Sequence, residues 1–165
     1  MSIRKEEQTM KRKAPTKREA DEGVEAILGG LLYDPTALKM RGFIQHGSVT
    51  TYDHALSVAR RCYAIAKGRR GIDLDSLVKA AFLHDLCLYD WHDPDPSHRL
   101  HGFRHAALAA DNAARLFAMP PAVCDMIRTH MWPLNLTRVP HSREAWILTL
   151  SDKMEAVKEC THSLT

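Results

Sequence analysis

The sequence predicts an all-α protein, and three observations support that fold class. Segments with apolar residues at helical spacing recur along the chain, whereas no run shows the sustained alternation of apolar and polar residues that half-buried strands have. Six of the eight prolines fall between these segments and leave the helix interiors clear: Pro94, Pro96, Pro120, Pro121, Pro133 and Pro140. A chain of 165 residues fits one domain with a single core.

The first part of the chain is expected to form two short helical pieces and then a longer helix. An apolar segment over 24–32, interrupted by paired glycines, predicts the first piece, and 36–43 predicts the second after an Asp-Pro turn. Thr50 or Thr51 is expected to cap a helix that runs to about Lys67, because a threonine hydroxyl can accept a hydrogen bond from the first backbone amides.

A buried helix is predicted to end at the dipeptide His84-Asp85. Asp73 is a suitable cap for its start, and residues 77–83 are apolar almost all round, which is typical of a helix buried on every side. A buried polar group left unpaired costs roughly 2–7 kcal/mol. A bound metal ion is one way to satisfy the two side chains. The segment 90–100, rich in Pro, Asp, Ser and His, is predicted to be a loop.

Two further helices are predicted to carry histidines near their ends. An alanine-rich helix over 103–117 has His105 in its first turn. Pro121 opens the next helix, which has His130 near its end and cannot continue far past Pro133.

The last helix is predicted over about 142–160 and has two different faces. One face carries larger apolar residues, namely Trp146, Leu150, Met154 and Val157. Asp152 lies on another face, where its neighbours are the small residues Ala145, Thr149 and Ala156. Such neighbours would let other helices and a metal ion approach closely. The expected result is a bundle with ligands directed inward from five helices.

Charge separates a predicted tail from a predicted domain. Residues 1–18 hold seven Lys or Arg and two Glu, which leaves a net charge of −2 for the rest of a chain whose total is +3. We therefore expect residues 1–22 to be a basic, flexible tail and residues 23–165 to be the helical domain. The tail has no aromatic residue for base stacking, so nucleic acid is not an expected partner. The sequence leaves open whether the chain forms a homo-oligomer.

Several protein classes find no support in the sequence. No stretch is apolar over the length of a membrane helix, and the N-terminus lacks the apolar region of a secretory signal, so a cytoplasmic location without a membrane partner is expected. The four cysteines are scattered with no CxxC pair, which is typical of reduced thiols. The chain has no P-loop, no GxSxG elbow and no HExxH motif.

Six residues form a candidate metal-binding set: His54, His84, Asp85, His105, His130 and Asp152. Imidazole nitrogen and carboxylate oxygen together suit Mn, Fe, Co, Ni or Zn. Each histidine alone is weak support. His105 could be a solvent-exposed residue at a helix start, and His130 could be favoured by the dipole at a helix end. His101 competes with His105 within HGFRH, and His105 is preferred because it begins the alanine-rich helix.

The order His, His-Asp, His, His, Asp resembles the HD-domain metal-dependent phosphohydrolases, over roughly residues 43–158. The phrases FIQHG, LHDLCLYDW, LHGFRH, HMWPL and SDKMEAVKE are similar to a bacterial subgroup of small HD-domain proteins. The resemblance implies an HD-domain helical bundle with a metal site between helices. It also implies two divalent ions, because His105 and His130 lie where two-metal members have additional ligands.

The resemblance also assigns the ligands to two ions. One ion would bind His54, His84 and Asp152, the other would bind His105 and His130, and Asp85 would bridge them. Two ions roughly 3.5–4 Å apart suit phosphoester hydrolysis, because they activate a water and neutralise charge on phosphate oxygens. Asp85 could instead act partly as a base.

The expected activity is hydrolysis of a phosphomonoester, a phosphodiester or a phosphoanhydride. The ligand order is also similar to a family that splits diadenosine tetraphosphate, so the expected partner is a small phosphorylated substrate such as a nucleotide. The absence of a GYP element argues against a cyclic-di-GMP phosphodiesterase. Lys153 and Arg104 are candidate phosphate contacts, Lys153 also as a catalytic residue. His46, Trp91 and His101 are candidate substrate contacts.

Two alternatives stay open. The first is an HD-fold metal-binding module that regulates or senses a ligand without turnover. The second is a purely structural metal, which a site with no exchangeable water position would support.

Overall fold

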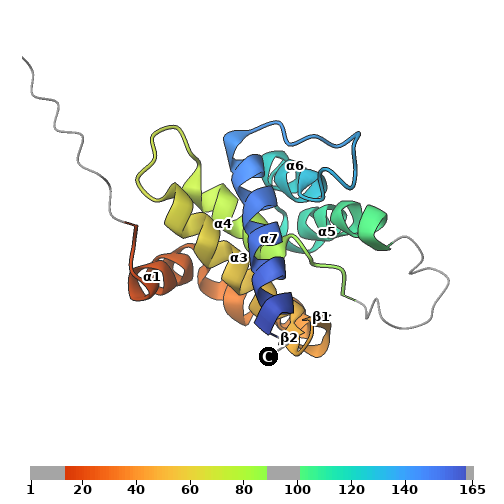
Figure 1. Cartoon of the computed structure of the whole chain (residues 1–165), viewed down its shortest axis with the longest axis horizontal. Coiled ribbons are helices and arrows are strands. Elements are labelled where there is room, and N and C mark those ends of the chain that lie inside the picture. Colours follow the sequence, from red (N-terminus) through yellow and green to blue (C-terminus); the bar gives the residue numbers. More distant parts are fainter. Residues whose placement is uncertain (1–13, 89–100, 163–165) are drawn as a thin grey trace, which may run out of the picture.

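The structure is a computed structural model that describes residues 14–88 and 101–162. Within these residues the chain forms seven α-helices, two 3-10 helices and one two-stranded sheet, which confirms the predicted all-α fold class (Figure 1). The whole of the predicted loop at 90–100 lies outside the described residues. Residues 1–13 of the predicted tail also lie outside them.

The N-terminal helix begins earlier than the sequence predicted. Helix α1 spans Lys17–Leu28 and is capped by Thr16, whose hydroxyl accepts a hydrogen bond from the Glu19 amide while the Glu19 carboxylate accepts one from the Thr16 amide. This capping box places a helix start inside the segment 1–22. The helix ends at Gly29, whose φ of +50° suits a residue without a Cβ.

Three short helical elements follow α1 along the chain. They are η1 (Gly29–Tyr33), α2 (Pro35–Leu38) and η2 (Lys39–Gly42). The Asp34 carboxylate caps α2 by accepting a hydrogen bond from the Thr36 amide at 2.7 Å. These elements contribute Leu32, Ala37 and Met40 to the core.

A small hairpin, which the sequence did not predict, precedes the third helix. Strands β1 (Ile44–His46) and β2 (Val49–Thr50) pair antiparallel, and Gly47, with a φ of +57°, permits the tight turn between them. Strands of three and two residues are too short for an alternating pattern to stand out in the sequence.

Helices α3 (Thr51–Ala66) and α4 (Leu74–Leu83) form the centre of the domain and pack against each other. Thr50 is the residue that caps α3, and Asp73 caps α4 as predicted. The apolar run of α4 is buried as predicted: Leu77, Val78, Ala80, Ala81, Phe82 and Leu83 have no exposed surface.

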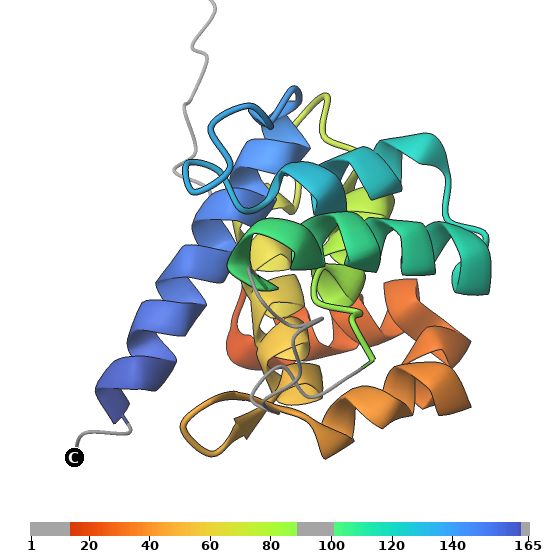
Figure 2. The same cartoon turned by 90° about the vertical axis from the view of Figure 1, so that its right-hand side faces the viewer.

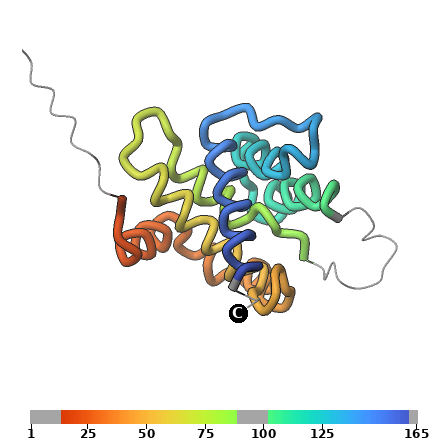
Figure 3. The backbone as a smooth tube through the Cα atoms, in the orientation of Figure 1, coloured from red at the N-terminus to blue at the C-terminus, as the bar shows by residue number. Residues whose placement is uncertain are grey.

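The remaining helices are α5 (His101–Phe117), α6 (Pro121–Thr129) and α7 (Arg143–His162). Figure 3 follows the path of the backbone, in which α5 and α6 lie side by side and α7 crosses in front of α3 and α4. The view in Figure 2, together with contacts between β1 and α7, places the C-terminal end of α7 near the hairpin. Helices from all parts of the domain therefore meet in its interior, where the predicted metal ligands lie.

Helix α7 turns its small residues inward and its larger apolar residues outward. Ala145, Thr149 and Asp152 are buried, whereas Leu150, Met154 and Val157 are 55%, 52% and 65% exposed. The two faces predicted from the sequence are therefore present, and the face with Asp152 is the one that packs against the other helices. Among the described residues, no helix is both long enough and apolar enough to cross a membrane.

Candidate metal centre

Four histidines and two aspartates from five helical segments meet in the interior of the domain. They are the six predicted residues His54, His84, Asp85, His105, His130 and Asp152, and all six are buried. His54 comes from α3, His105 from α5 and Asp152 from α7, while His84-Asp85 and His130 follow the ends of α4 and α6. Such a gathering of ionisable groups inside a core requires compensating charge.

His84 and His130 are held by the same local arrangement. Each is the C-cap residue of its helix, and each ring donates its Nδ1 hydrogen to the carbonyl three residues earlier, at 2.8 Å to Ala81 and 2.7 Å to Ile127. In both histidines this bond turns the Nε2 atom toward the cluster. An outer hydrogen bond of this kind commonly orients histidines that bind a metal.

His54 is oriented by a carboxylate instead of a carbonyl. Its Nδ1 donates to the Oε2 atom of Glu159 at 2.8 Å, and its Nε2 lies 3.2 Å from the Oδ1 atom of Asp152. Glu159 lies two helical turns after Asp152 on α7, so both carboxylates reach the same histidine. Glu159 is not among the residues predicted from the sequence, although its spacing of seven residues from Asp152 places it on the same face of the helix.

His105 lies close to both His130 and Asp85. Its Nε2 is 3.1 Å from the Nε2 of His130 and 3.3 Å from the Oδ1 of Asp85. Because Nδ1 of neutral His130 carries the hydrogen that goes to Ile127, its Nε2 must accept, and His105 donates. His105 is therefore a buried member of the cluster and not a solvent-exposed residue at a helix start.

Asp85 lies between two pairs of histidines and presents one oxygen to each. Its Oδ2 is 3.2 Å from the Nε2 of His84 and 3.9 Å from the Nε2 of His54. Its Oδ1 is 3.3 Å from the Nε2 of His105 and 3.7 Å from the Nε2 of His130. The carboxylate thus divides the cluster into two parts.

The electrostatics of the cluster separate the histidines into two kinds. Burial would lower the pKa of His54, but its hydrogen bonds to Asp152 and Glu159 outweigh burial and raise the pKa to about 9. His130 has a pKa of about 3, because it is fully buried and lies beside His84 and His105. Burial would raise the pKa of Asp85, yet the neighbouring His84 and His105 hold it well below its usual range.

The residues present fit a metal ion by their chemistry. Donor atoms of His54, His84 and Asp152 lie within 4.8 Å of one another, and so do those of His84, Asp85 and His130. The Nε2 atom of His84 is buried and lies 3.2 Å from the Oδ2 of Asp85 and 3.5 Å from the Oδ1 of Asp152, yet it completes no hydrogen bond with the described residues. In the neutral ring the Nε2 atom is an acceptor that faces two carboxylate oxygens, and a divalent ion bound between the three atoms would satisfy all of them.

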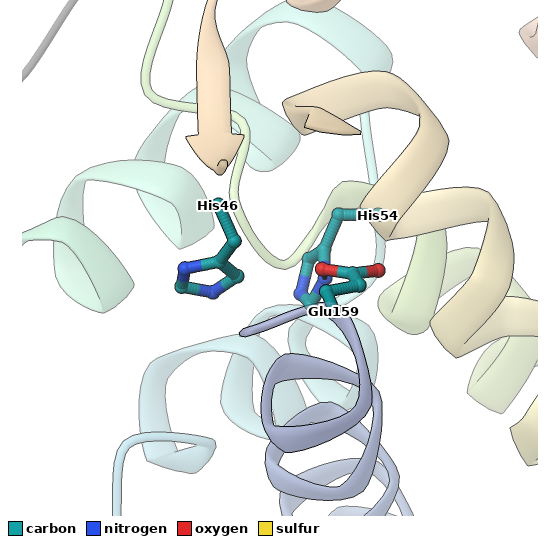
Figure 4. Close-up of side chains that lie close together, drawn as sticks. All are labelled: His46, His54 and Glu159. Atoms are coloured by element: carbon teal, nitrogen blue, oxygen red, sulfur yellow. Dashed lines mark hydrogen bonds and ion pairs between the residues drawn. The ribbon is translucent and has the colours of Figure 1, made fainter. Parts of the chain in front are cut away.

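His46 lies beside His54, and Figure 4 shows these two residues together with Glu159. Its half-buried ring packs edge-on against the ring of His54 with 5.5 Å between centroids, and burial lowers its pKa. Donor atoms of these three residues also lie within 4.8 Å of one another. Because His54 already donates Nδ1 to Glu159, this carboxylate serves to orient His54.

The other predicted site residues lie outside the cluster or outside the described part of the chain. Lys153 lies at the rim, where its Nζ donates to the carbonyl oxygen of His130 at 3.0 Å and lies 4.0 Å from the Oδ2 of Asp152. Arg104 is exposed on α5. His101 begins α5, but its side chain is outside the described residues, as is the whole of Trp91.

Gln45 is a further residue in contact with the cluster. Its Nε2 donates to the Oδ2 of Asp85 at 2.6 Å. Gln45 precedes His46, which the sequence indicated as a substrate contact, and the sequence connected neither residue to Asp85. That contact depends on how the hairpin lies against α4, which no local pattern encodes.

Comparison with known proteins agrees with this geometry. The family model described as HD domain matches residues 51–157, which is more than half of the chain. Neither the comparison with curated proteins nor that with solved structures gives a match. HD-domain proteins are typically hydrolases that depend on divalent metals. With the family model matched over residues 51–157 and the six candidate ligands gathered at one buried centre, the chain belongs to the HD-domain family.

Proposed function

We propose that the chain is a phosphohydrolase that uses two divalent metal ions. The observation that carries this proposal is the position of Asp85, whose two oxygens face two different pairs of histidines at 3.2–3.9 Å. A carboxylate placed in this way can give one oxygen to each of two ions. A single ion would leave the nitrogen atoms of one histidine pair without an ion to bind.

Each ion would have its own ligands. His54, His84 and Asp152 with the Oδ2 of Asp85 would hold one ion, and His105 and His130 with the Oδ1 of Asp85 would hold the other. The mixture of imidazole and carboxylate fits Mn, Fe, Co, Ni or Zn. When bound, the pair of ions supplies a water of lowered pKa and neutralises charge on the phosphate oxygens.

The residues around the ions have separate roles in this proposal. Lys153, at the rim beside the carbonyl oxygen of His130, would bind a phosphate oxygen, and His46, whose ring packs against His54, would contact the substrate. Burial lowers the pKa of the Lys153 ammonium, although the nearby carboxylates of Asp152 and Asp85 oppose that effect. Asp85 is a poor proton acceptor because its pKa lies well below the usual range, which favours a ligand role over a base role.

A small phosphorylated compound, with a nucleotide first among the candidates, is the proposed substrate. This follows from the resemblance of the ligand order to phosphohydrolases of nucleotides, together with a lysine at the rim of the centre. We propose a cytoplasmic location, and neither nucleic acid nor a membrane as a partner, from the composition of the chain.

The test is metal content followed by a hydrolysis screen. Purified protein is stripped with a chelator, reloaded with Mn, Fe, Co or Ni, and analysed for bound metal by elemental analysis. The same samples are screened against phosphomonoesters, nucleotides and dinucleoside polyphosphates. Close to two ions per chain with metal-dependent phosphate release is the expected result.

The variant His130→Ala tests the role of the second ion, the one that His105 and His130 would bind. It should retain about one ion per chain and lose at least about 100-fold in phosphate release, since a two-metal reaction needs both charges. His141→Ala removes a histidine whose side chain is exposed on the surface, and it should behave as the wild type. Ions bound in full with no turnover on any substrate would contradict the proposal and favour a regulatory module.

A further inference from the structure

The hairpin before α3 contains a structural irregularity at the metal centre. Ile44 pairs with Thr50 and His46 pairs with Val49, so Gln45 is an additional residue on β1 with no partner across the strands. Such a bulge re-aims a side chain and is common beside active sites. In a regular strand, consecutive side chains point to opposite faces.

The bulge lets two consecutive side chains reach the same centre from the hairpin. His46 packs its ring against His54, with 5.5 Å between the ring centroids. Gln45 donates its amide hydrogen to the Oδ2 of Asp85 at 2.6 Å. The hairpin thus contacts both the edge of the centre and the carboxylate in its middle.

The orientation of the Gln45 amide is set by a second residue. The buried hydroxyl of Thr51 donates to the Oε1 of Gln45 at 3.2 Å and lies 3.4 Å from the carbonyl oxygen of Phe43. Because the amide oxygen accepts from Thr51, the amide nitrogen must face Asp85. Thr51 is the first residue of α3, so the chain of hydrogen bonds is anchored on the same helix that carries His54.

We infer that Gln45 is a positioning residue that fixes the rotation of the Asp85 carboxylate, so that each of its oxygens faces its own pair of histidines. A carboxylate oxygen has lone pairs for two partners, so Oδ2 can accept from Gln45 and still bind a metal ion. A neutral amide suits this position, because a lysine would compete with the ion for Asp85 and a carboxylate would repel Asp85. The assignment rests on the proposed role of Asp85 as a ligand.

The test uses Co²⁺ binding to the full chain without any substrate. Gln45→Met keeps the length of the side chain and removes the hydrogen bond. We expect it to weaken Co²⁺ binding roughly 10- to 100-fold, which is typical for loss of an outer partner of a metal ligand. The visible absorption of bound Co²⁺ should also change, because that spectrum depends on the geometry of the ligands. The far-ultraviolet circular dichroism should stay as in the wild type.

Two further sets of variants distinguish the effect of losing the hydrogen bond from the effect of disturbing the hairpin. Ile44→Ala trims an exposed residue of the same strand and should bind Co²⁺ as the wild type does. Thr51→Val removes the hydroxyl that orients the amide and should weaken binding less than Gln45→Met, whereas Thr51→Ser should restore it.

The inference is overturned if Gln45→Met binds Co²⁺ with wild-type affinity and spectrum, or if Ile44→Ala weakens binding to the same extent. It is also overturned if the wild type binds no Co²⁺. Since no substrate is present, these results do not depend on whether the chain hydrolyses phosphate esters. Failure of the hydrolase proposal alone would appear as Co²⁺ binding with the expected Gln45 effect and no turnover.

Discussion

The half of the metal centre formed by His54, His84 and Asp152 carries more negative charge than the half formed by His105 and His130. We call these the acidic half and the imidazole half. The acidic half has its own aspartate and, behind His54, the carboxylate of Glu159. The Oδ1 of Asp85 faces the imidazole half, at 3.3 and 3.7 Å from the Nε2 atoms of His105 and His130.

The difference shows that the charged neighbours of each histidine, carboxylates in one half and other histidines in the other, set the character of each half. His54 has a pKa of about 9 because two carboxylates surround it, whereas His130 has a pKa of about 3 because it is buried among other histidines. We expect the acidic half to bind its ion more tightly, since nearby negative charge stabilises a cation in a buried site. The imidazole half would bind the second ion more weakly.

Removal of the carboxylate that both halves share should have the largest effect. Asp85→Ala is expected to lose both ions and at least about 10³-fold in phosphate release, because both halves lose an oxygen ligand. Elemental analysis and a phosphate assay measure this. Asp111→Ala, which removes an exposed carboxylate paired with Arg128, is the control. Full metal content in Asp85→Ala would contradict the bridging role.

The same variant also addresses a structural metal. If the ion serves catalysis, Asp85→Ala should lose activity while its helical content stays as in the wild type. If the ion is structural, the variant should show a large fall in melting temperature. Circular dichroism recorded during heating distinguishes the two outcomes.

Ion binding to the acidic half should depend on pH. His54 has a raised pKa of about 9, so it is protonated at neutral pH and must release a proton before its Nε2 can bind a metal. Affinity should therefore increase about tenfold per pH unit between pH 6.5 and 8.5 and level off above about pH 9. His130, with a pKa of about 3, is neutral throughout this range and adds no such dependence.

Titration with Co²⁺ at several pH values, in buffers of different ionisation enthalpy, measures both the affinity and the protons released. His130→Ala, which keeps the acidic half, should retain the pH dependence. An affinity that stays constant or falls as the pH rises would contradict the protonated state of His54.

Weakening the outer carboxylate should affect one half alone. Glu159→Gln keeps the shape of the side chain but removes its charge, and it should lower the affinity of the acidic half roughly 10- to 100-fold. The imidazole half should bind as before. Glu22→Gln, at an exposed ion pair on α1, is the matched control. Equal loss in both halves would show that the two halves are not independent in the way proposed.

Lys153 should give the smallest effect, because it lies between the halves and binds neither ion. Lys153→Met is expected to raise KM and lower kcat/KM about tenfold, which corresponds to about 1.4 kcal/mol, with metal content unchanged. Lys158→Met, five residues further along α7, should leave both kinetic constants as they are. Loss of metal from Lys153→Met would indicate a structural role for the lysine.

Much of the fold followed from local chemistry. The buried run of α4 and the cap at Asp73 were predicted because apolar periodicity and capping depend on residues within a few turns. The start of α1 was placed too late, since the capping box of Thr16 and Glu19 lies in a segment whose charge indicated a tail. The hairpin went unpredicted because its strands are very short.

The residues of the candidate site were likewise predicted only in part. The six candidate ligands were named from their order and from their positions in predicted helices or at helix ends, and the structure brings all six together. Glu159 and Gln45 were not connected to them. Each of these two residues reaches its partner across a large separation in sequence, 105 residues to His54 and 40 residues to Asp85.

The sequence by itself determined the helical class, the ends of the helices at His84 and His130, and the two faces of α7, because these depend on propensity, periodicity and local hydrogen bonds. Only the tertiary structure decided which oxygen of Asp85 faces which histidines, which carboxylate orients His54, and how the Gln45 amide reaches Asp85. Those features depend on how helices and the hairpin pack in three dimensions, and packing is set by the fit of distant surfaces and not by neighbours along the chain.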